Sequence, residues 1–510
     1  MNSPASIALF TAILLTPLAG RAADWPQWGA RHSRNMVSAE TGLPSDFDPT
    51  TGRNVKWTAA LGTRCFSSPV VAQGRVLIGT NNGQPRDPRH QGDRGVLMCF
   101  DAADGSFRWQ LVVPKLDSDP YLDWPRAGIC SPPTVEGDRV YTVTNRDEVV
   151  CLDLNGLADG NDGPFQDEGR HMTPAGDAAL APGPRDADII WLLDLRTAAG
   201  VRPHDSAHAS ILIDGPNLYV NTSNGLNSRH EGIERPEAPS LVVLDKRTGR
   251  LIAREDEGIS PRIFHAAWSS PSLGEVDRRR LIFHGGGDGV CYAFEALPTD
   301  RLALPDRPTK LTCVWRFDCD PTAPKQDVHQ YIRNRRESPS VIMGMPVFHD
   351  GRVYLTVGGD LWWGKRQCWA QCIDPRGEGD ITDAGLVWAS ELNRHCCVTP
   401  AVHDGLVFVA DCKGIVHCLD ANAGTPYWTH ETRGEIWASP LVADGKVYVG
   451  NRRGEFCILA ASKEKELLSS TRLGGAIHGT VAAADGTVFI ATDEKLLALE
   501  ERPVEKRGQH

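Results

Sequence analysis

A repeated unit runs through most of this chain and restricts it to very few folds. Eight times, a short apolar segment is followed by a turn that contains Gly, Asp or both, and then by a second and a third apolar segment. The last three units contain no long insertion and begin at Thr399, Ser439 and Thr480, so their spacings are 40 and 41 residues. A period of this length with four short strands per unit is typical of β-propellers. The repeat therefore predicts an all-β fold, an eight-bladed β-propeller of four-stranded antiparallel blades. The other five units begin at Ser67, Ser131, Ser210, Ser270 and Met345.

The two ends of the repeat region complement each other. The eighth unit ends after its third strand, whereas residues 54–61 have the pattern of a fourth strand. We therefore expect the N-terminal strand to complete the last blade, which removes the exposed edges that make open sheets prone to aggregation. The predicted organisation is a signal peptide (1–22), an N-terminal strap outside the ring (23–53), the propeller (54–500) and a polar tail (501–510).

The first residues and the charge indicate where the protein works. Residues 7–18 are mostly apolar and are followed by Gly20-Arg21-Ala22, a pattern expected at a leader cleavage site. No later apolar stretch is long enough to span a bilayer. The net charge is −11 and no basic run stands out, which argues against nucleic acid as a partner. We expect an exported monomer, periplasmic or extracellular.

Tryptophan and cysteine recur in register. The units from Cys99 to Trp109 and from Cys418 to Trp428 share one spacing, with Asp and Gly at a turn and Trp on the fourth strand. Such a Trp is expected to pack between neighbouring blades. Cys99, Cys151, Cys372 and Cys418 occupy one repeated position, so they are interpreted as small buried hydrophobic residues. Two other pairings stay open, Cys65 with Cys130 and Cys313 with Cys319.

The repeat register also predicts which residues surround the mouth of the central channel. In a propeller blade the innermost strand comes first, so the residue two positions before each first strand should face this mouth. The resulting ring is Phe66, Ile129, His208, Trp268, Met343, Cys397, Trp437 and His478, with a collar of Arg64, Arg126, Asp205, His265, Arg394, His395 and Glu435. These residue types suit a flat anionic ligand. The alternative is a mixed polar lining that holds water.

Two local motifs add candidate chemistry. The adjacent Cys396 and Cys397 could form a vicinal disulfide, whose strained eight-membered ring is a rigid flat surface, or could remain two thiols facing opposite sides of a strand. A loop rich in oxygen ligands could bind Ca²⁺, although its spacing is not that of an EF-hand. This loop contains Asp153, Asn155, Asp159, Asn161 and Asp162. The C-x-x-C-H, G-x-S-x-G and H-E-x-x-H motifs do not occur.

These repeats resemble the pyrroloquinoline quinone (PQQ) repeat superfamily of eight-bladed propellers. The resemblance rests on the Cys/Val-Leu-Asp-x-x-x-Gly-x-x-x-Trp units and on the Ser/Thr-Pro strand starts, over about residues 54–500. The superfamily contains quinoprotein alcohol dehydrogenases and BamB-like scaffolds without a cofactor. The dehydrogenase resemblance implies that PQQ lies between a vicinal disulfide (Cys396-Cys397) and Trp268 or Trp437, beside Ca²⁺, with its carboxylates held by Arg64, Arg126 or Arg394. In that family the Cys pair lies early in the chain, whereas here it lies in the sixth blade.

Our first functional hypothesis is an exported binding or scaffold module with a small-molecule or protein partner at the channel mouth. The alternative is a PQQ- and calcium-dependent dehydrogenase that oxidises an alcohol, polyol or sugar. A third possibility is a carbohydrate-directed enzyme that uses the His and Glu side chains of the collar. The candidate binding residues are Arg64, Arg126, His208, His265, Trp268, His395, Cys396, Cys397, Glu435, Trp437 and His478.

Overall fold

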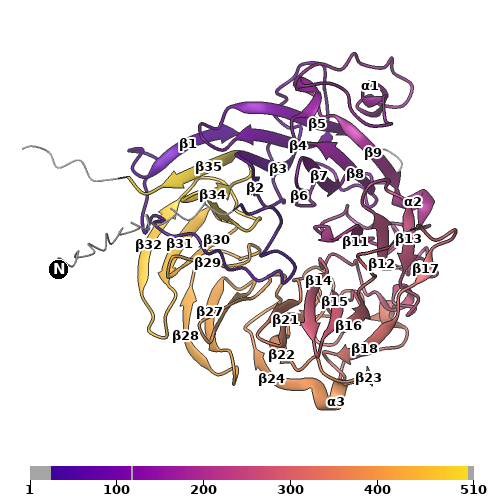
Figure 1. Cartoon of the computed structure of the whole chain (residues 1–510). Helices are drawn as coiled ribbons and strands as arrows, with labels where there is room; N and C mark the ends of the chain where they lie inside the picture. Colours follow the sequence, from indigo (N-terminus) through magenta and orange to yellow (C-terminus); the bar gives the residue numbers. More distant parts are fainter. Residues whose placement is uncertain (1–23, 117–118, 302, 503–510) are drawn as a thin grey trace, which may run out of the picture.

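Eight β-sheets surround a central channel in the computed structural model, which describes residues 24–116, 119–301 and 303–502 (Figure 1). The predicted eight-bladed propeller is confirmed. The predicted signal peptide lies outside the described residues, as does most of the polar tail. Within the described part of the chain, no helix is both long enough and apolar enough to cross a bilayer.

The blades follow one another along the chain, each with its innermost strand first. Blade 1 contains β2 (Val70–Ala72), β3 (Arg75–Asn81), β4 (Arg94–Asp101) and β5 (Phe107–Pro114). Blade 2 contains β6 (Thr134–Glu136), β7 (Arg139–Val143), β8 (Glu148–Asp153) and β9 (Ile189–Asp194). Blade 3 contains β10 (Leu212–Asp214), β11 (Asn217–Asn221), β12 (Leu241–Asp245) and β13 (Leu251–Arg254), extended by β17 (Thr309–Lys310). Blade 4 contains β14 (Ser272–Val276), β15 (Arg279–Gly285), β16 (Val290–Glu295) and β18 (Cys313–Asp318), extended by β23 (Gly379–Asp380).

The second half has the same order. In blade 5, β19 (Ser340–Val341) and β20 (Val347–His349) pair with β21 (Arg352–Gly359), followed by β22 (Cys368–Ile373) and β24 (Leu386–Glu391). Blade 6 contains β25 (Ala401–His403), β26 (Leu406–Ala410), β27 (Ile415–Asp420) and β28 (Pro426–Glu431). Blade 7 contains β29 (Leu441–Ala443), β30 (Lys446–Gly450), β31 (Glu455–Ala460) and β32 (Leu467–Arg472). Blade 8 contains β33 (Ala482–Ala484), β34 (Thr487–Ala491), β35 (Lys495–Glu500) and β1 (Val55–Ala60).

The helices are short and lie in the connections between strands. They are α1 (Glu168–His171), α2 (Leu195–Ala198) and α3 (Thr382–Gly385), together with the 3-10 turns η1 (Gly156–Ala158), η2 (Ser260–Arg262) and η3 (Val328–Tyr331).

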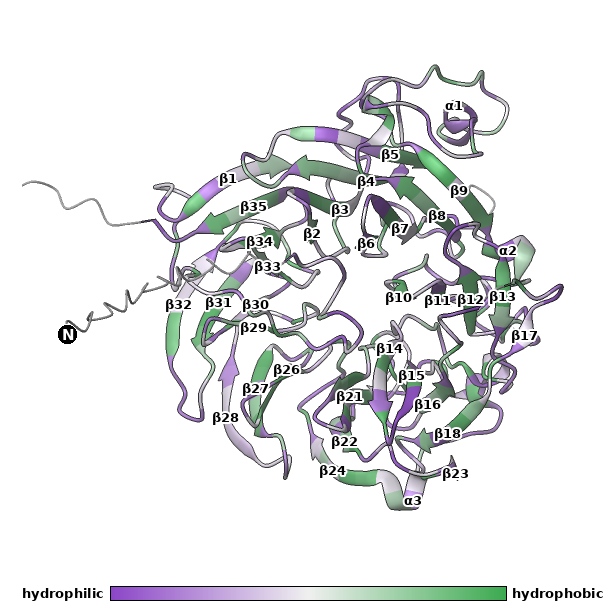
Figure 2. Ribbon diagram, in the orientation of Figure 1, coloured by the Kyte–Doolittle hydropathy of each residue, from purple (hydrophilic) through white to green (hydrophobic). Residues whose placement is uncertain are grey.

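The ring is closed by a strand from the start of the propeller. Strand β1 pairs antiparallel with β35, with Thr58 opposite Leu497. This confirms the predicted closure, in which the N-terminal strand supplies the outermost strand of the last blade. The apolar core lies between the faces of adjacent blades, whereas outer strands such as β28 and β32 are mostly exposed and more polar (Figure 2). The blades therefore hold one another in place through their faces.

A tryptophan on the outermost strand links many of the blades to the next one. The indole N–H of Trp388 in blade 5 donates to the backbone carbonyl of Ala421 in blade 6 at 2.9 Å. The ring of Trp388 also covers Gly424, which has a φ of +68° in the following turn. The same donation runs from Trp57 to Ala102, from Trp109 to Leu154, from Trp191 to Lys246 and from Trp428 to Ser462. The repeated Gly and Trp are thus two halves of one contact between blades.

The N-terminal strap runs through the channel, so the expectation that it lies outside the ring is wrong. Its backbone and side chains bond the innermost strand, or the residues beside that strand, in all eight blades. Trp25 forms a bridge with Val71 of blade 1, Asn35 bonds Val402 of blade 6, and the Met36 carbonyl accepts from Val442 of blade 7. In Figure 1 this indigo segment crosses the centre of the ring. On the side that faces the channel, the innermost strands have no neighbouring strand. The strap forms hydrogen bonds with part of the backbone groups on that side.

One buried arginine holds the strap in place. Arg34 is fully buried, and its guanidinium donates to the carbonyls of Pro271, Trp28 and Ser210 and to the Ser210 hydroxyl, at 2.8–3.2 Å. Burial lowers the pKa of Arg34 to about 9. These bonds connect the strap to blades 3 and 4.

Candidate functional site

The ring predicted from the repeat register forms a real cavity at the channel mouth. Seven of its eight residues line one cavity of about 110 Å³, whereas Ile129 is fully buried elsewhere. This agreement arises because equivalent positions in each blade project toward the same point on the axis. The seven are Phe66, His208, Trp268, Met343, Cys397, Trp437 and His478.

Further aromatic residues, which do not belong to the predicted ring, complete the cavity. Trp362 is 39% exposed and makes edge-on contacts with Trp268 and Trp437, at centroid distances of 5.6 and 5.8 Å. It belongs to the insertion at 361–369, where the Trp-Trp pair was the available signal. Trp28 reaches the cavity from the strap and donates its indole N–H to Thr480 Oγ1 at 3.0 Å. The cavity is therefore lined by four tryptophans.

The cavity is apolar, with few but specific polar groups. None of its described lining residues is Arg, Lys, Asp or Glu. The buried indole N–H groups of Trp268 and Trp437 have no partner among the described residues. Burial lowers the pKa of His208 to about 4, so this imidazole is neutral at physiological pH. His478 lies 3.4 Å from Asp493, between the rings of Phe66 and Trp437.

The charged residues of the predicted collar have other partners. Arg64 pairs with Asp493 at 3.0 Å, and Glu435 pairs with Arg452 at 2.7 Å. The Arg452 guanidinium in turn covers the ring of Trp437 at 3.9 Å from its centroid. Arg126 lines a separate pocket with Asn81 and Asp93. None of the three predicted arginines, Arg64, Arg126 and Arg394, therefore lines the mouth cavity.

Cys396 and Cys397 are free thiols in this structure, on opposite sides of the chain. The Cys396 thiol is buried and donates to the carbonyl of Ala410 at 3.0 Å, whereas Cys397 lines the cavity. Their neighbour His395 is buried, and its imidazole hydrogen-bonds the backbone of Gly364. Of the two alternatives given above, the structure has the unpaired thiols. The other open pairings, Cys65 with Cys130 and Cys313 with Cys319, are free thiols as well.

These residues do not fit PQQ in the way that the dehydrogenase resemblance implies. The stacking ring of a vicinal disulfide is missing, and no guanidinium lines the cavity to hold the carboxylates of the cofactor. The cavity of about 110 Å³ is also smaller than the roughly 300–1,000 Å³ of typical ligand pockets. A side-chain-sized apolar group suits it better.

The loop proposed for calcium makes its own internal contacts. The Asp153 carboxylate pairs with Arg139 at 2.5 Å, and the Asn155 amide donates to Asp159 at 3.0 Å. The Asn161 side chain donates to Glu168, and the Asp162 backbone N–H donates to Asp188, each at 2.9 Å. The structure thus gives these polar groups different partners and does not direct them toward one shared point.

A histidine cluster lies beside the cavity, and only one of its three members was among the predicted site residues. His204, His230 and His265 bring one ring nitrogen each within 4.8 Å of one another. Burial lowers the pKa of His265, but Asp360, 3.0 Å away, outweighs this effect and raises it. Burial holds the pKa of His204 well below its usual value and raises that of Asp205 to about 6. His204 and His230 lie outside the repeat register, in loops at the mouth.

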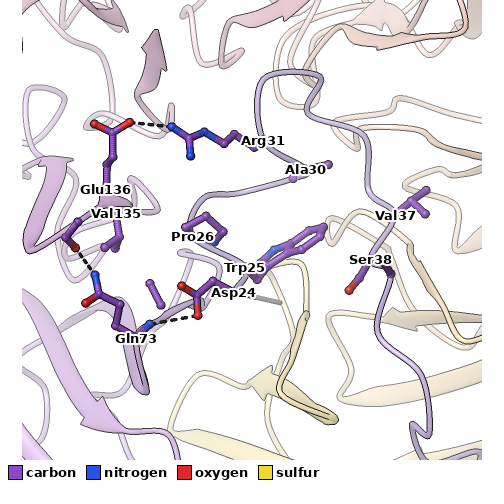
Figure 3. Close-up of a pocket in the computed structure, with 14 residues that line it drawn as sticks. Asp24, Trp25, Pro26, Ala30, Arg31, Val37, Ser38, Gln73, Val135 and Glu136 are labelled. Carbon is purple, nitrogen blue, oxygen red and sulfur yellow. Dashed lines mark hydrogen bonds and ion pairs between the residues drawn. The ribbon is translucent and has the colours of Figure 1, made fainter. Parts of the chain in front are cut away.

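A second pocket, of about 380 Å³, lies between the strap and the turns of blades 1 and 2 (Figure 3). Its polar groups bond one another: Arg31 pairs with Glu136 at 2.7 Å, and the Gln73 backbone N–H donates to Asp24 at 3.1 Å. This pocket reflects how the strap docks onto the inner strands.

Comparisons with known proteins agree with the fold. A family model described as outer membrane protein assembly factor BamB matches residues 39–262 and 374–502. The crystal structure of BamB from Moraxella catarrhalis has a TM-score of 0.50 and 14% identity, covering 89% of this chain and 98% of that one.

Two curated dehydrogenases match shorter stretches. Quinohemoprotein alcohol dehydrogenase of Comamonas testosteroni is 28% identical over 19% of this chain and 15% of its own length. 1-Butanol dehydrogenase (cytochrome c) of Thauera butanivorans is 27% identical over 34% of this chain and 24% of its own length. This chain thus spans less than a quarter of each of these relatives. Because the family model covers more than half of the chain and the eight-bladed fold agrees with it, the chain belongs to the PQQ-repeat family described as outer membrane protein assembly factor BamB.

Proposed function

We propose that this propeller is a binding module whose channel mouth takes an apolar, side-chain-sized group presented by a protein partner. The observation that carries this proposal is the single cavity lined by Trp28, Trp268, Trp362 and Trp437. Tryptophan is enriched among the residues that dominate binding energy at protein interfaces, because it combines a large apolar area with one hydrogen-bond donor.

The cavity has the properties of a receptor for such a group. Trp362 stands at its rim and is partly exposed, so a partner can reach it. The strap occupies the channel behind it, which leaves the mouth as the side of approach. The free indole N–H groups of Trp268 and Trp437 can donate to a carbonyl of the incoming group. The family description, an assembly factor, favours a protein as the source of this group.

The dehydrogenase alternative has weaker support. It draws on the names of two relatives that match only part of this chain, and the cavity lacks the groups that would hold PQQ. We further propose that the protein acts outside the cytoplasm, as the leader-like residues 7–18 and the family suggest.

Site-specific photo-crosslinking tests the binding site. A benzophenone amino acid replaces Trp362 in the native host, and the control carries it at Tyr427, which is 38% exposed on the outer strand β28. We expect a discrete protein adduct from position 362 and none from position 427. A further Trp437→Ala substitution should remove the adduct, because it takes away one wall of the cavity.

PQQ titration provides the opposing test. Two results together would contradict the proposal: saturable one-to-one quenching of protein fluorescence by PQQ in the presence of Ca²⁺, and no protein adduct from position 362. They would support the dehydrogenase alternative. Absence of quenching at tens of micromolar PQQ, together with the adduct, supports the binding module.

A further inference from the structure

We propose that His204, His230 and His265, together with Asp205, form a binding site for a divalent transition-metal ion, specifically Zn²⁺. The three side chains come from three separate loops at the channel mouth: the loop before β10, the β11–β12 connection and the loop before β14. Their ring centroids lie 4.7–6.2 Å apart. One ring nitrogen from each lies within 4.8 Å of the others.

Each histidine is oriented by a second partner, as in metal sites. His204 Nδ1 bonds the carbonyl of Leu226 at 2.8 Å, and His265 Nδ1 bonds Asp360 at 3.0 Å. His230 hydrogen-bonds the backbone of Ser228. Metal-binding histidines almost always direct their other ring nitrogen to a carbonyl or a carboxylate, which fixes the ring and its tautomer. His204 and His265 follow that rule.

The inward-facing atoms lack partners. His204 is fully buried, and its Nε2 has no hydrogen-bond partner among the described residues. Asp205 Oδ1 is buried and equally without a partner, while its Oδ2 lies 3.7 Å from His204 Nε2 and 3.9 Å from His265 Nε2. Unsatisfied buried polar atoms are costly, so their convergence on one point calls for a ligand.

The surroundings define what would change on binding. The Trp363 indole N–H donates to His265 Nε2 at 3.2 Å, so this nitrogen already presents a lone pair, and a metal would replace that donor. The neighbouring Arg202 guanidinium is bound to Asp119 and Glu234. Two of the four proposed ligands, Asp205 and His230, have left-handed backbone conformations, with φ values of +61° and +59°.

The donor set selects the class of ion. Three imidazole nitrogens and one carboxylate oxygen suit Zn²⁺ and its first-row neighbours, whereas Ca²⁺ requires oxygen ligands. Tetrahedral bonds of about 2.0–2.1 Å place ligand nitrogens about 3.3 Å apart, so the three loops would close slightly around the ion. His265 also lies 5.5 Å from Trp362 and 5.7 Å from Trp268, measured between ring centroids, which puts the ion at the edge of the mouth cavity.

A second cluster of possible ligands serves as an internal control. Asp87, His90 and Asp186 also lie within 4.8 Å of one another. Both carboxylates, however, are already paired with Arg89, at 2.5 and 3.0 Å. Because the Arg89 charge already neutralises these carboxylates, they attract a cation only weakly. We therefore expect no Zn²⁺ at this cluster.

Metal titration of the full-length protein, purified without a polyhistidine tag and stripped with a chelator, tests the proposal. We expect one equivalent of Zn²⁺ by calorimetry, and a visible absorption band of tetrahedral type with Co²⁺. His230→Asn and His265→Asn should weaken binding by more than the roughly 10–100-fold that loss of an outer partner costs, and Asp360→Asn by about that amount. The controls His90→Asn and His349→Asn should bind like the unmodified protein.

The proposal is overturned if the unmodified protein takes up no stoichiometric Zn²⁺, or if His230→Asn and His265→Asn retain its affinity. His230 is only partly buried, so its variant should fold, and thermal melting checks this. The result does not depend on which group occupies the mouth cavity.

Discussion

At the scale of single residues, the thiols around the sixth blade show how neighbours in sequence face different environments. Cys396 contacts the thiol of Cys368, and Cys397 contacts that of Cys412. Consecutive Cα atoms are only 3.8 Å apart, below the usual range for a disulfide. We therefore predict that oxidation joins Cys368 to Cys396 and Cys397 to Cys412, and that no vicinal ring forms.

Peptide mapping under non-reducing conditions after mild oxidation checks this prediction. Burial raises the pKa of the Cys368 thiol well above its usual value, so we expect slow oxidation at neutral pH. The Cys412→Ser variant should leave the Cys368–Cys396 peptide unchanged. Recovery of a peptide with Cys396 linked to Cys397 would contradict the prediction.

The residue scale also shows how far sequence reasoning can reach. Seven ring residues were correctly predicted to lie around one cavity. Each occupies the same position relative to the first strand of its blade, and the turns in the sequence mark where each strand begins. Trp362, His204 and His230 could not be found this way, since they lie in insertions that obey no repeat. Arg126 was misplaced for the same reason: its loop is held by Asp93, not by the blade register.

At the scale of the elements, the turn glycines contribute to packing between blades. A Cβ at Gly424 would lie 2.5 Å from the ring of Trp388, whereas a Cβ at Gly405 would meet nothing within 4 Å. Both glycines have similar positive φ values, +68° and +73°, so they share the backbone cost of about 1–2 kcal/mol for a residue with a side chain. We predict that Gly424→Ala lowers the free energy of unfolding by roughly 1–3 kcal/mol more than Gly405→Ala does.

Urea unfolding followed by circular dichroism measures this difference. Equal effects of the two substitutions would show that the Trp–Gly contact adds nothing to the backbone cost. The comparison depends on the similar positive φ of the two glycines, which makes the backbone cost nearly equal in both variants.

The strap is the element that the sequence did not place. Its residues lack the repeat pattern, and many of its bonds with the blades use backbone N–H and carbonyl groups, which leave no trace in side-chain types. We predict that Arg34→Met costs on the order of 3–5 kcal/mol, because four buried acceptors lose a charged donor. Arg31→Met, which removes an exposed ion pair with Glu136, should cost less than about 1 kcal/mol.

Two measurements distinguish a loosened strap from general unfolding. Denaturant unfolding gives the free-energy change, and limited proteolysis should cut Arg34→Met within residues 24–47 while the blades stay intact. If Arg34→Met is as stable as Arg31→Met, the buried guanidinium does not hold the strap.

At the scale of the whole molecule, ring closure makes the blades interdependent, so a local protonation should affect the stability of the entire propeller. His284 on β15 is fully buried, with its Nε2 3.2 Å from the Ser240 hydroxyl. Burial lowers its pKa from 6.5 to about 4. The unfolded chain therefore takes up a proton below pH 6.5, whereas the folded protein does so only near pH 4.

This difference predicts the direction and the size of the pH effect. The stabilisation from a neutral His284 is complete above pH 6.5 and is lost as the pH falls from 6.5 to 4, with a full amplitude on the order of 3 kcal/mol. Glu148 has its pKa lowered to about 2, since His171 and Arg146 outweigh the opposing effect of burial, so its contribution declines only below its ordinary pKa of 4.5.

The unfolding free energy from urea titrations at pH 7.5, 6 and 5 should therefore fall for the unmodified protein. It should fall less for His284→Gln, which can keep a bond to Ser240, whereas the control His349→Gln, at the partly exposed end of β20, should keep the full slope. Parallel curves for all three proteins would mean that His284 does not link the propeller to pH.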